Sequence, residues 1–285
     1  MKPDYLSDAK LKTFIDTALK EDVGDGDHSA LASIPPGENK QARLIVKDNG
    51  ILAGVELAQK IFNQVNPSFQ FHLKIKDGST VTYGDIAFTV EGNARDLLTA
   101  ERLVLNCMQR MSGIATYTHY LNGLINHTKA RLLDTRKTTP NFRMLEKWAV
   151  LIGGGVNHRF GLYDMIILKD NHVDYAGGVK KAILSTRNYL KEKKLDLKIE
   201  IETRNLKEVT EVLETGGIHR IMLDNMKPSL LKEAVQLING KYETEASGGI
   251  TEQNIKEVAE TGVDFISVGA LTHSIKSLDM SLKAF

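Results

Sequence analysis

The stretch RLLDTRKTTP (131–140) joins a short apolar run to two adjacent cations, three hydroxyls and a proline. The apolar residues predict a buried β-strand that ends at Asp134, and Pro140 is typical of the first turn of a helix. Proteins of the α/β class bind anionic ligands where a strand ends and the next helix begins. This stretch therefore predicts an α/β fold with an anion site at its strand ends.

The same unit recurs toward the C-terminus. Further apolar strand candidates end near Leu168, Glu202, Asp224, Ala246 and Val268, and the last four of these ends are each 22 residues apart. Helical patterns lie between them, at 205–214, 228–238 and 252–261. A strand, a helix and two loops need about that length in a βα unit. Runs such as MIIL (165–168) are apolar without alternation, which is typical of parallel strands buried on both faces.

These units predict a six- to seven-stranded TIM-like α/β barrel over residues 113–272, with room for an extra strand around 156–160. An open doubly wound sheet has the same period, but no GxGxxG fingerprint follows the first strand. Residues 1–112 predict an N-terminal α+β sandwich. Its expected elements are a helix at 6–20, a helix at Val55–Val65, an alternating strand at 69–75 and a long helix from Ala94 to about residue 126.

Composition narrows the class of ligand. The 285 residues carry 37 Lys and Arg against 36 Asp and Glu, a net charge of +1, so we expect neither a nucleic-acid nor a membrane partner. The local cations therefore indicate a small acidic ligand. The single cysteine, Cys107, lies in an apolar helical context and predicts a core residue in a reduced, cytoplasmic protein. The polar N-terminus MKPDYLSDAKLK shows no targeting signal.

The strand ends are sorted by charge, and functional side chains lie at these ends in βα barrels. Arg136 and Arg159 each suit a carboxylate, which a guanidinium binds through paired hydrogen bonds. Lys137 and Lys169 offer compact charge that suits phosphate. In chain order, the candidates are Arg136, Lys137, His158, Arg159, Lys169, Glu200, Glu202, Asp224, Asn225, Ser247, Gly248, Gly249, Gly269 and Ala270.

The later strand ends offer carboxylates and backbone amides. Glu202 and Asp224 lie at neighbouring ends and suit one magnesium ion shared with ligand phosphates. Loop 247–249 precedes a helix that we expect to start near Thr251, so its amides suit a phosphate. Loop 269–270 occupies the usual phosphate position after the last strand.

Each feature alone has an ordinary structural explanation. A strand-end lysine is usually a solvated surface charge, Glu200 and Glu202 suit an ion-pair network, and loop 247–249 suits a tight turn. Their recurrence at one end of successive strands favours a ligand site. The acidic segment EDVGDGDHS (21–29) suits either a solvated turn or a metal loop, although it lacks the calcium-loop spacing.

With these residues in view, the chain resembles the quinolinate phosphoribosyltransferases over nearly its full length. The resemblance implies transfer of phosphoribose from phosphoribosyl pyrophosphate to the ring nitrogen of quinolinate, with magnesium. Pyrophosphate and carbon dioxide leave, and the product is nicotinate mononucleotide, in de novo NAD biosynthesis. The resemblance rests on AERLVLNCMQRMSGIAT (100–116), DTRKTTP (134–140), GGGVNHRFGLYDMIILKDNH (153–172), EIET (200–203), LDN (223–225), EASGGI (245–250) and VGALTHS (268–274).

The resemblance also implies roles for single residues. For quinolinate binding it implies Arg136, His158, Arg159 and Lys169, with Arg102 supplied across a homodimer interface. For phosphoribosyl pyrophosphate it implies Lys137, Ser247, Gly248, Gly249, Gly269 and Ala270. For catalysis it implies Lys137, Lys169, Glu202 and Asp224, the last two near magnesium. It further implies that segment 273–285, ending in a helix, packs on the N-terminal domain. Whether dimers assemble into hexamers stays open.

Three other functions fit parts of this pattern. A Schiff-base aldolase-type barrel would use Lys169, but the acidic pair near Glu202 would then be superfluous. A related barrel from molybdenum-uptake operons would take another acceptor, which the cations suited to a dicarboxylate disfavour. A non-catalytic scaffold has no need of cations and carboxylates that face each other at one mouth.

Overall fold

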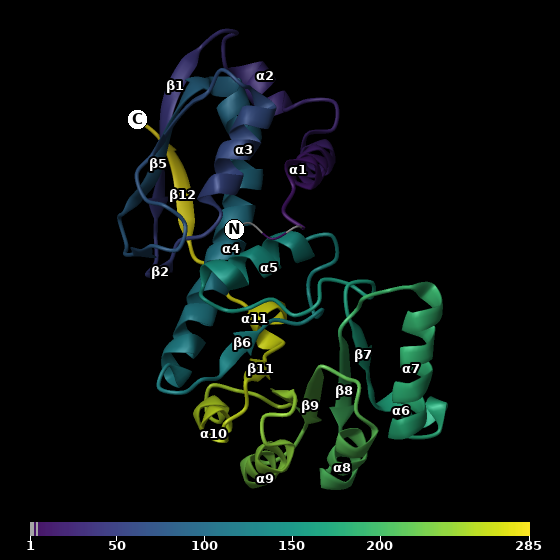
Figure 1. Cartoon of the computed structure of the whole chain (residues 1–285). Coiled ribbons are helices and arrows are strands. Elements are labelled where there is room, and N and C mark those ends of the chain that lie inside the picture. Colours follow the sequence, from purple (N-terminus) through teal and green to yellow (C-terminus); the bar gives the residue numbers. More distant parts are fainter. Residues whose placement is uncertain (1–2, 4) are drawn as a thin grey trace. The chain divides into compact units, whose positions relative to one another are not determined.

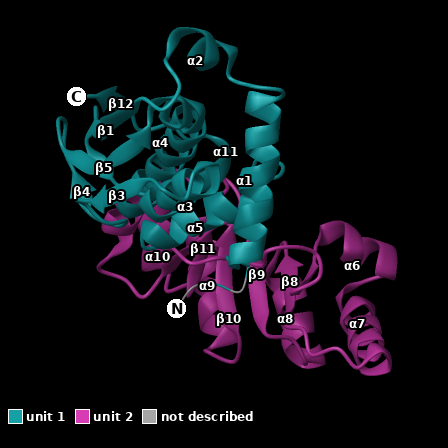
Figure 2. Cartoon of the chain, turned by 90° about the horizontal axis from the view of Figure 1, so that it is seen from above, with its two compact units in different colours: residues 1–119, 138–154, 270–285 teal, residues 120–137, 155–269 magenta. Residues whose placement is uncertain are grey.

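The computed structural model describes residue 3 and residues 5–285 (Figure 1). The chain forms two compact units (Figure 2). Unit 1 comprises residues 1–119, 138–154 and 270–285, and unit 2 comprises residues 120–137 and 155–269. Residues 1, 2 and 4, which belong to the N-terminus where we expect no targeting signal, lie outside the description. The predicted domain limits, 1–112 and 113–272, stay a prediction.

Unit 1 is built on a four-stranded antiparallel sheet in the order β12-β1-β5-β3, with a separate β2-β4 pair. Its elements are α1 (Asp8–Val23), α2 (His28–Ser33), β1 (Asn39–Val46), β2 (Gly50–Ile51), α3 (Val55–Val65), β3 (Gln70–Leu73), β4 (Thr80–Val81), β5 (Ile86–Asn93), most of α4 (Ala94–Ile125), α5 (Arg143–Ile152), α11 (Ala270–His273) and β12 (Met280–Ala284).

Helix α3 covers the sheet of unit 1 with its apolar side (Figure 1). Phe62 of α3 is fully buried and meets Phe88 of β5 edge to face, with 6.0 Å between the ring centroids. The helix has the bounds that its sequence pattern predicts, and the helices expected at 6–20 and from Ala94 are present as α1 and α4. Burying one apolar stripe of a helix is what fixes it against a sheet.

The acidic segment at 21–29 contributes to two helices of unit 1. Its first residues extend α1, and Asp27 caps α2 by accepting a hydrogen bond from the amide of Ala30 at 3.0 Å. A side-chain cap satisfies a helix amide that otherwise has no partner. This carboxylate therefore caps a helix.

The chain terminus is a strand, and the expected terminal helix is wrong. Residues 280–284 form β12, which pairs with β1 in antiparallel register, with Leu282 opposite Leu44. Met280 and Leu282 are buried and the residues between and after them are more exposed, which is the period of two that a strand requires.

Unit 2 is a parallel α/β unit, which confirms the predicted fold class. Its six-stranded sheet has the order β6-β11-β10-β9-β8-β7, and helices α7 to α10 lie side by side in chain order (Figure 1). Its elements are β6 (Arg131–Leu133), β7 (Ile166–Leu168), α6 (Asp170–Ala176), α7 (Val179–Lys193), β8 (Ile199–Thr203), α8 (Leu206–Thr215), β9 (Arg220–Asp224), α9 (Pro228–Ile238), β10 (Glu243–Ser247), α10 (Ile255–Glu260) and β11 (Phe265–Ser267).

The extra strand expected around 156–160 is reduced to a single bridge between Val156 and Leu133. The chain then turns, because Asp164 accepts hydrogen bonds from the amides of Phe160 and Gly161. Over the described residues, the ladder pairs form an open series that ends at β7 on one side and at this bridge on the other. Hydrogen bonds between strands therefore do not close a ring here.

Cys107 is a core residue, as its sequence context predicts. Only 1% of the residue is exposed, and burial raises the pKa of the thiol to about 12. A thiol that stays protonated is a poor nucleophile. Within residues 3 and 5–285, the structure has no helix with the length and apolar character needed to cross a bilayer.

Candidate functional site

The carboxyl ends of the parallel strands in unit 2 share one edge of the sheet, so the polar residues that follow them converge. Lys169 follows β7, and its Nζ lies 3.7 Å from Oε2 of Glu202 on β8. The Lys169 side chain is half exposed, whereas Glu202 is buried. Burial and the nearby negative charge of Asp224 raise the pKa of Glu202. The structure thus brings these three predicted residues together.

Asn225 connects Asp224 to the glycine loop. Its Nδ2 donates to Oδ2 of Asp224 at 2.5 Å, and its backbone amide donates to the carbonyl of Ser247 at 2.8 Å. Asn225 adopts the left-handed conformation (φ 54°), which asparagine tolerates better than most residues. A Cβ on Gly248 would approach the Asn225 side chain to 2.3 Å. Asn225 thereby fixes the position of the Asp224 carboxylate relative to loop 247–249.

The loop 247–249 is a turn followed by a delayed helix. Gly248 and Gly249 both have positive φ (86° and 63°), and Asn254 donates to the carbonyl of Gly249 at 2.9 Å. Helix α10 begins at Ile255, so the expected helix start near Thr251 is wrong. Asn254 Oδ1 instead accepts from the amide of Thr251 and holds an intervening turn. The loop therefore offers glycine amides rather than a helix end.

Three predicted anion-binding residues lie in the segments after β6 and Val156. Arg136 and Lys137 are exposed, and the amide of Lys137 donates to Thr135 Oγ1 at 3.0 Å. Burial lowers the pKa of Arg159, and the positive charge of Arg136 lowers it further. Two guanidinium groups that repel each other are stabilised when an anion lies between them. This pair is suited to a carboxylate-bearing ligand.

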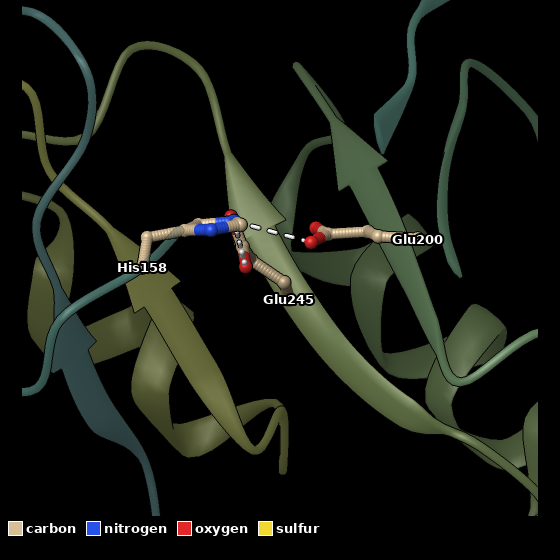
Figure 3. Close-up of side chains that lie close together, drawn as sticks. All are labelled: His158, Glu200 and Glu245. Carbon is tan, nitrogen blue, oxygen red and sulfur yellow. Dashed lines mark ion pairs between the residues drawn. The ribbon is translucent and has the colours of Figure 1, made fainter. Parts of the chain in front are cut away.

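His158 lies in a buried charged cluster instead of at the open edge (Figure 3). Its Nε2 is 3.1 Å from Oε2 of Glu200 and 3.3 Å from Oε2 of Glu245. Arg220 reaches the same carboxylates, with Nη1 at 3.1 Å from Glu245 and 3.9 Å from Glu200. Each strand from β8 to β10 thus contributes one charged side chain to the cluster.

The sequence interpretation missed Arg220 and Glu245 and gave Glu200 no committed role. The sequence did contain a sign of the cluster: charged residues stand inside the apolar strand segments IEIET (199–203), RIMLD (220–224) and ETEAS (243–247), where buried side chains are expected. A charge within a buried strand needs a partner of opposite charge. Pairing such positions across neighbouring strands would have found the cluster.

Charge is unevenly distributed between the two buried carboxylates. Burial and the charge of Glu245 raise the pKa of Glu200 to about 7. Burial alone would raise the pKa of Glu245, but His158 and Arg220 outweigh it and lower that pKa. Glu245 is therefore the ionised partner of Arg220.

The protonation of His158 is under two opposing influences. Burial alone would lower its pKa, and the two carboxylates raise it to about 9, which favours the cation. However, Nδ1 accepts a hydrogen bond from the amide of Arg159 at 2.7 Å, which requires that nitrogen to be unprotonated. This hydrogen bond makes Nδ1 an acceptor, so the ring is neutral and carries its proton on Nε2.

The ligand atoms of His158, Glu200 and Glu245 lie within 4.8 Å of one another, a spacing that a metal ion could bridge. Arg220 already supplies positive charge to both carboxylates at this place. A guanidinium beside the ligands repels a cation. The cluster is therefore better described as an ion-pair network than as a metal site.

Two predicted residues lie in unit 1. Arg102 is exposed on α4, and Ala270 is the first residue of α11, directly after Gly269 of unit 2. The proposed contribution of Arg102 across a dimer interface stays a prediction. The remaining predicted residues belong to unit 2 and lie in its strands or in the loops that follow them.

This arrangement defines a class: an α/β enzyme for anionic substrates, with guanidinium groups, carboxylates and glycine amides at the carboxyl edge of a parallel sheet. Residues 27–112 match the model of the quinolinate phosphoribosyl transferase N-terminal domain, and residues 114–283 match that of its C-terminal domain. The chain therefore belongs to the quinolinate phosphoribosyl transferase family.

Individual relatives agree with this assignment. The chain is 48% identical to quinolinate phosphoribosyltransferase [decarboxylating] 1b of Nicotiana tabacum, over 99% of this chain and 85% of the relative. It is 42% identical to the probable nicotinate-nucleotide pyrophosphorylase [carboxylating] of Synechocystis sp., over 93% and 89%. The crystal structure of NadC from Streptococcus pyogenes superposes with a TM-score of 0.93 at 38% identity, covering 99% and 98% of the two chains.

Proposed function

We propose that this chain transfers phosphoribose from phosphoribosyl pyrophosphate to quinolinate and releases carbon dioxide and pyrophosphate. The product is nicotinate mononucleotide, a precursor in de novo NAD biosynthesis. The observation that carries the proposal is the charge sorting at one sheet edge in a chain of this family. Quinolinate has two carboxylates and phosphoribosyl pyrophosphate has phosphate at both ends, so the pair needs cations, amides and a carboxylate together.

Quinolinate binding falls to the cationic side of the edge. Arg159, whose pKa the positive charge of Arg136 helps to lower, binds the ring carboxylates together with Arg136 through paired hydrogen bonds. Lys169 completes that side, His158 supports it by accepting a hydrogen bond from the amide of Arg159, and Arg102 comes from a second copy of the chain. Holding two polyanions at reacting distance supplies much of the acceleration, because orientation replaces a diffusive encounter.

Bond formation takes place on the other side. The pyridine nitrogen attacks the anomeric carbon of ribose while the bond to pyrophosphate breaks. Lys137 and the amides of loops 247–249 and 269–270 offset the phosphate charges. Glu202 and Asp224 stabilise the positive charge that grows on ribose. The alkylated ring nitrogen is then cationic and stabilises the electron pair left on the adjacent ring carbon when carbon dioxide departs. A proton from water adds to that carbon and completes nicotinate mononucleotide, so no lysine Schiff base is needed.

Magnesium fits the acidic pair. Glu202 and Asp224 offer oxygen ligands, and the negative charge of Asp224 contributes to raising the pKa of the buried Glu202, so a cation there relieves repulsion. The ion would supply positive charge to the pyrophosphate. Lys169 contacts this carboxylate and is half exposed, which does not suit the Schiff-base alternative, since a Schiff-base lysine needs a desolvated pocket.

The proposed partners are the two substrates and a second copy of the chain, in a homodimer, with neither nucleic acid nor membrane. A cytoplasmic location is proposed from the single buried cysteine. Some plant relatives carry "chloroplastic" or "mitochondrial" in their names, among them those of Oryza sativa and Nicotiana tabacum. The location of this chain is therefore best tested by fractionation of the cells that produce it.

A single assay tests the function. Purified protein is incubated with quinolinate, phosphoribosyl pyrophosphate and magnesium, and the pyridine product is followed by absorbance and identified by mass. We expect one nicotinate mononucleotide for each carbon dioxide released, and less product when magnesium is chelated. No product from the intact chain under these conditions would refute the proposal.

Replacing Arg136 tests the division of the edge. Arg136→Ala removes one carboxylate-binding group, so we expect the KM for quinolinate to rise about tenfold or more while that for phosphoribosyl pyrophosphate changes little. Steady-state kinetics and calorimetric titration with quinolinate measure the effect. Arg187→Ala, at an arginine on α7, is the matched control. Unchanged quinolinate affinity in Arg136→Ala would show that this side chain does not bind the substrate.

A further inference from the structure

The buried cluster of His158, Glu200, Arg220 and Glu245 does not have the composition that would make the folded protein most stable. Glu200 is completely buried, and among the described residues neither of its carboxylate oxygens has a well-aligned hydrogen bond. A buried carboxylate that is incompletely satisfied costs stability, and a well-packed apolar residue would be at least as stable at such a place. An arrangement that costs stability calls for a function in the nearby site.

His158 links this cluster to the substrate edge. One ring nitrogen, Nε2, faces Glu200 and Glu245, and the other, Nδ1, accepts from the amide of Arg159. The amide of His158 itself donates to Asp134 Oδ1 at 2.8 Å. The ring is therefore held on both sides, and its tautomer decides whether Nδ1 can accept. If the proton moved to Nδ1, the hydrogen bond to Arg159 would be lost.

Arg220 holds the carboxylates in place. Its guanidinium contacts Glu245 on the buried side and Glu243 at 3.0 Å on the more exposed side. It also stacks over the ring of Phe265, with 4.1 Å between its Cζ and the ring centroid. Groups behind a binding residue often fix its orientation and tautomer in this manner.

We propose that Glu200 and Glu245 are positioning residues for the quinolinate side of the site: they keep the His158 proton on Nε2, so that Nδ1 holds the backbone of Arg159 in its binding position. The inference rests on the proposed function for the identity of the ligand. The link from the carboxylates to His158 and to the Arg159 amide does not depend on that identity.

Three variants test the proposal. Glu200→Gln and Glu245→Gln keep the side-chain shape but remove the negative charge that faces Nε2 and replace one of the two acceptor oxygens with an NH₂ donor. Glu243→Gln is the matched control, because Glu243 contacts Arg220 on its more exposed side. Each full-length variant is labelled with ¹⁵N-histidine, and the ring nitrogens are observed by NMR without substrate. His158→Asn identifies the signal.

We expect the native protein and Glu243→Gln to show the Nε2-protonated tautomer of His158. Glu200→Gln and Glu245→Gln should move the ring toward the Nδ1-protonated tautomer. In kinetics, both variants should raise the KM for quinolinate about tenfold, the scale on which supporting residues act, with the KM for phosphoribosyl pyrophosphate within about twofold of native. Thermal unfolding shows that each variant is folded, and either variant alone suffices if the other fails to fold.

Two outcomes would overturn the proposal. One is an unchanged His158 tautomer in a folded Glu200→Gln or Glu245→Gln variant. The other is an equal loss of affinity for both substrates, which a purely structural role predicts. The NMR experiment needs no substrate. If the native protein made no product, the proposed function would fail, and the ring signals would still decide whether these carboxylates hold His158.

Discussion

Single residues with unusual backbone conformations shape the acidic end of the site. Asn225 is left-handed, and its side chain occupies the space beside Gly248 while it donates to Asp224. Sequence placed Asn225 at a strand end but gave it no task, since the value of an amide there depends on which backbone lies beside it. Gly248 was expected to offer an amide, and the structure adds that it must also lack a side chain.

A substitution at Gly248 separates these two requirements. In Gly248→Ala the new Cβ would approach atoms of Asn225 to 2.3–2.9 Å at a φ of +86°, so loop and amide must shift. We expect backbone strain to lower the free energy of unfolding by about 1–2 kcal/mol. In addition, we expect the displaced loop amides to raise the KM for phosphoribosyl pyrophosphate about tenfold. Gly240→Ala is the control, because Gly240 has a φ of +71° and open space around it. Equal kinetics in the two variants would contradict the role of Asn225.

In unit 2, polar contacts join strands β10 and β11 at their amino ends, opposite the carboxyl ends that carry the candidate site. Asp264, just before β11, accepts from the amide and hydroxyl of Thr244 on β10 at 2.9 and 2.8 Å and pairs with Lys129 at 2.7 Å. In α/β barrels, the amino ends of strands serve stability and the carboxyl ends serve catalysis. This division predicts that changes at Asp264 affect folding alone.

Replacing Asp264 tests that division. We expect Asp264→Asn to lower the free energy of unfolding by about 1–2 kcal/mol at neutral pH while both KM values stay unchanged. Burial alone would raise the pKa of Asp264, but Lys129 and Thr244 outweigh it and lower the pKa. The stability that the ionised Asp264 adds to the native protein is therefore present above the ordinary pKa of 3.8. It is lost as the pH falls through the lowered pKa of the folded state. Denaturant titrations at pH 7 and pH 3 measure it, and a variant with normal stability at pH 7 would argue against the clamp.

The elements also show how far sequence can lead. The spacing of apolar runs predicts β7 to β11 and the three helices α8 to α10, because burial on both faces leaves a strong pattern. It fails at 156–160, where Asp164 turns the chain. It makes no prediction at 280–284, where the resemblance implied a helix and a five-residue strand is too short to reveal its period. The cluster of Glu200, Arg220 and Glu245 needed the order of the strands, which local sequence does not contain.

At the scale of the whole molecule, the sheet of unit 1 joins strands that are far apart in the sequence. Strand β12 supplies one neighbour of β1, and β5 supplies the other. Segment 276–280 also forms hydrogen bonds with Gln109 of α4. The carbonyl of Gln109 accepts from the amide of Leu278 at 3.0 Å, and the Gln109 side chain donates to the carbonyl of Met280. Unit 1 therefore depends on residues that follow the whole of unit 2.

Leu282→Ala tests this dependence. Leu282 is buried opposite Leu44, and its truncation should lower the free energy of unfolding by about 2–4 kcal/mol. Lys283→Ala, at the exposed neighbouring position, should change it by less than about 0.5 kcal/mol. Denaturant unfolding followed by circular dichroism compares the two. Similar stability in both variants would mean that β12 contributes little to unit 1.

The late position of β12 has a consequence for synthesis on the ribosome. All six strands of the parallel sheet have been translated by Ser267, whereas β1 gains its second neighbour only when residues 280–284 emerge. The nascent chain therefore carries an unpaired strand edge while more than half of its residues are made, and such edges attract other strands. Chaperones that recognise extended, apolar segments should find this polypeptide most accessible along β1 until residues 280–284 have been translated.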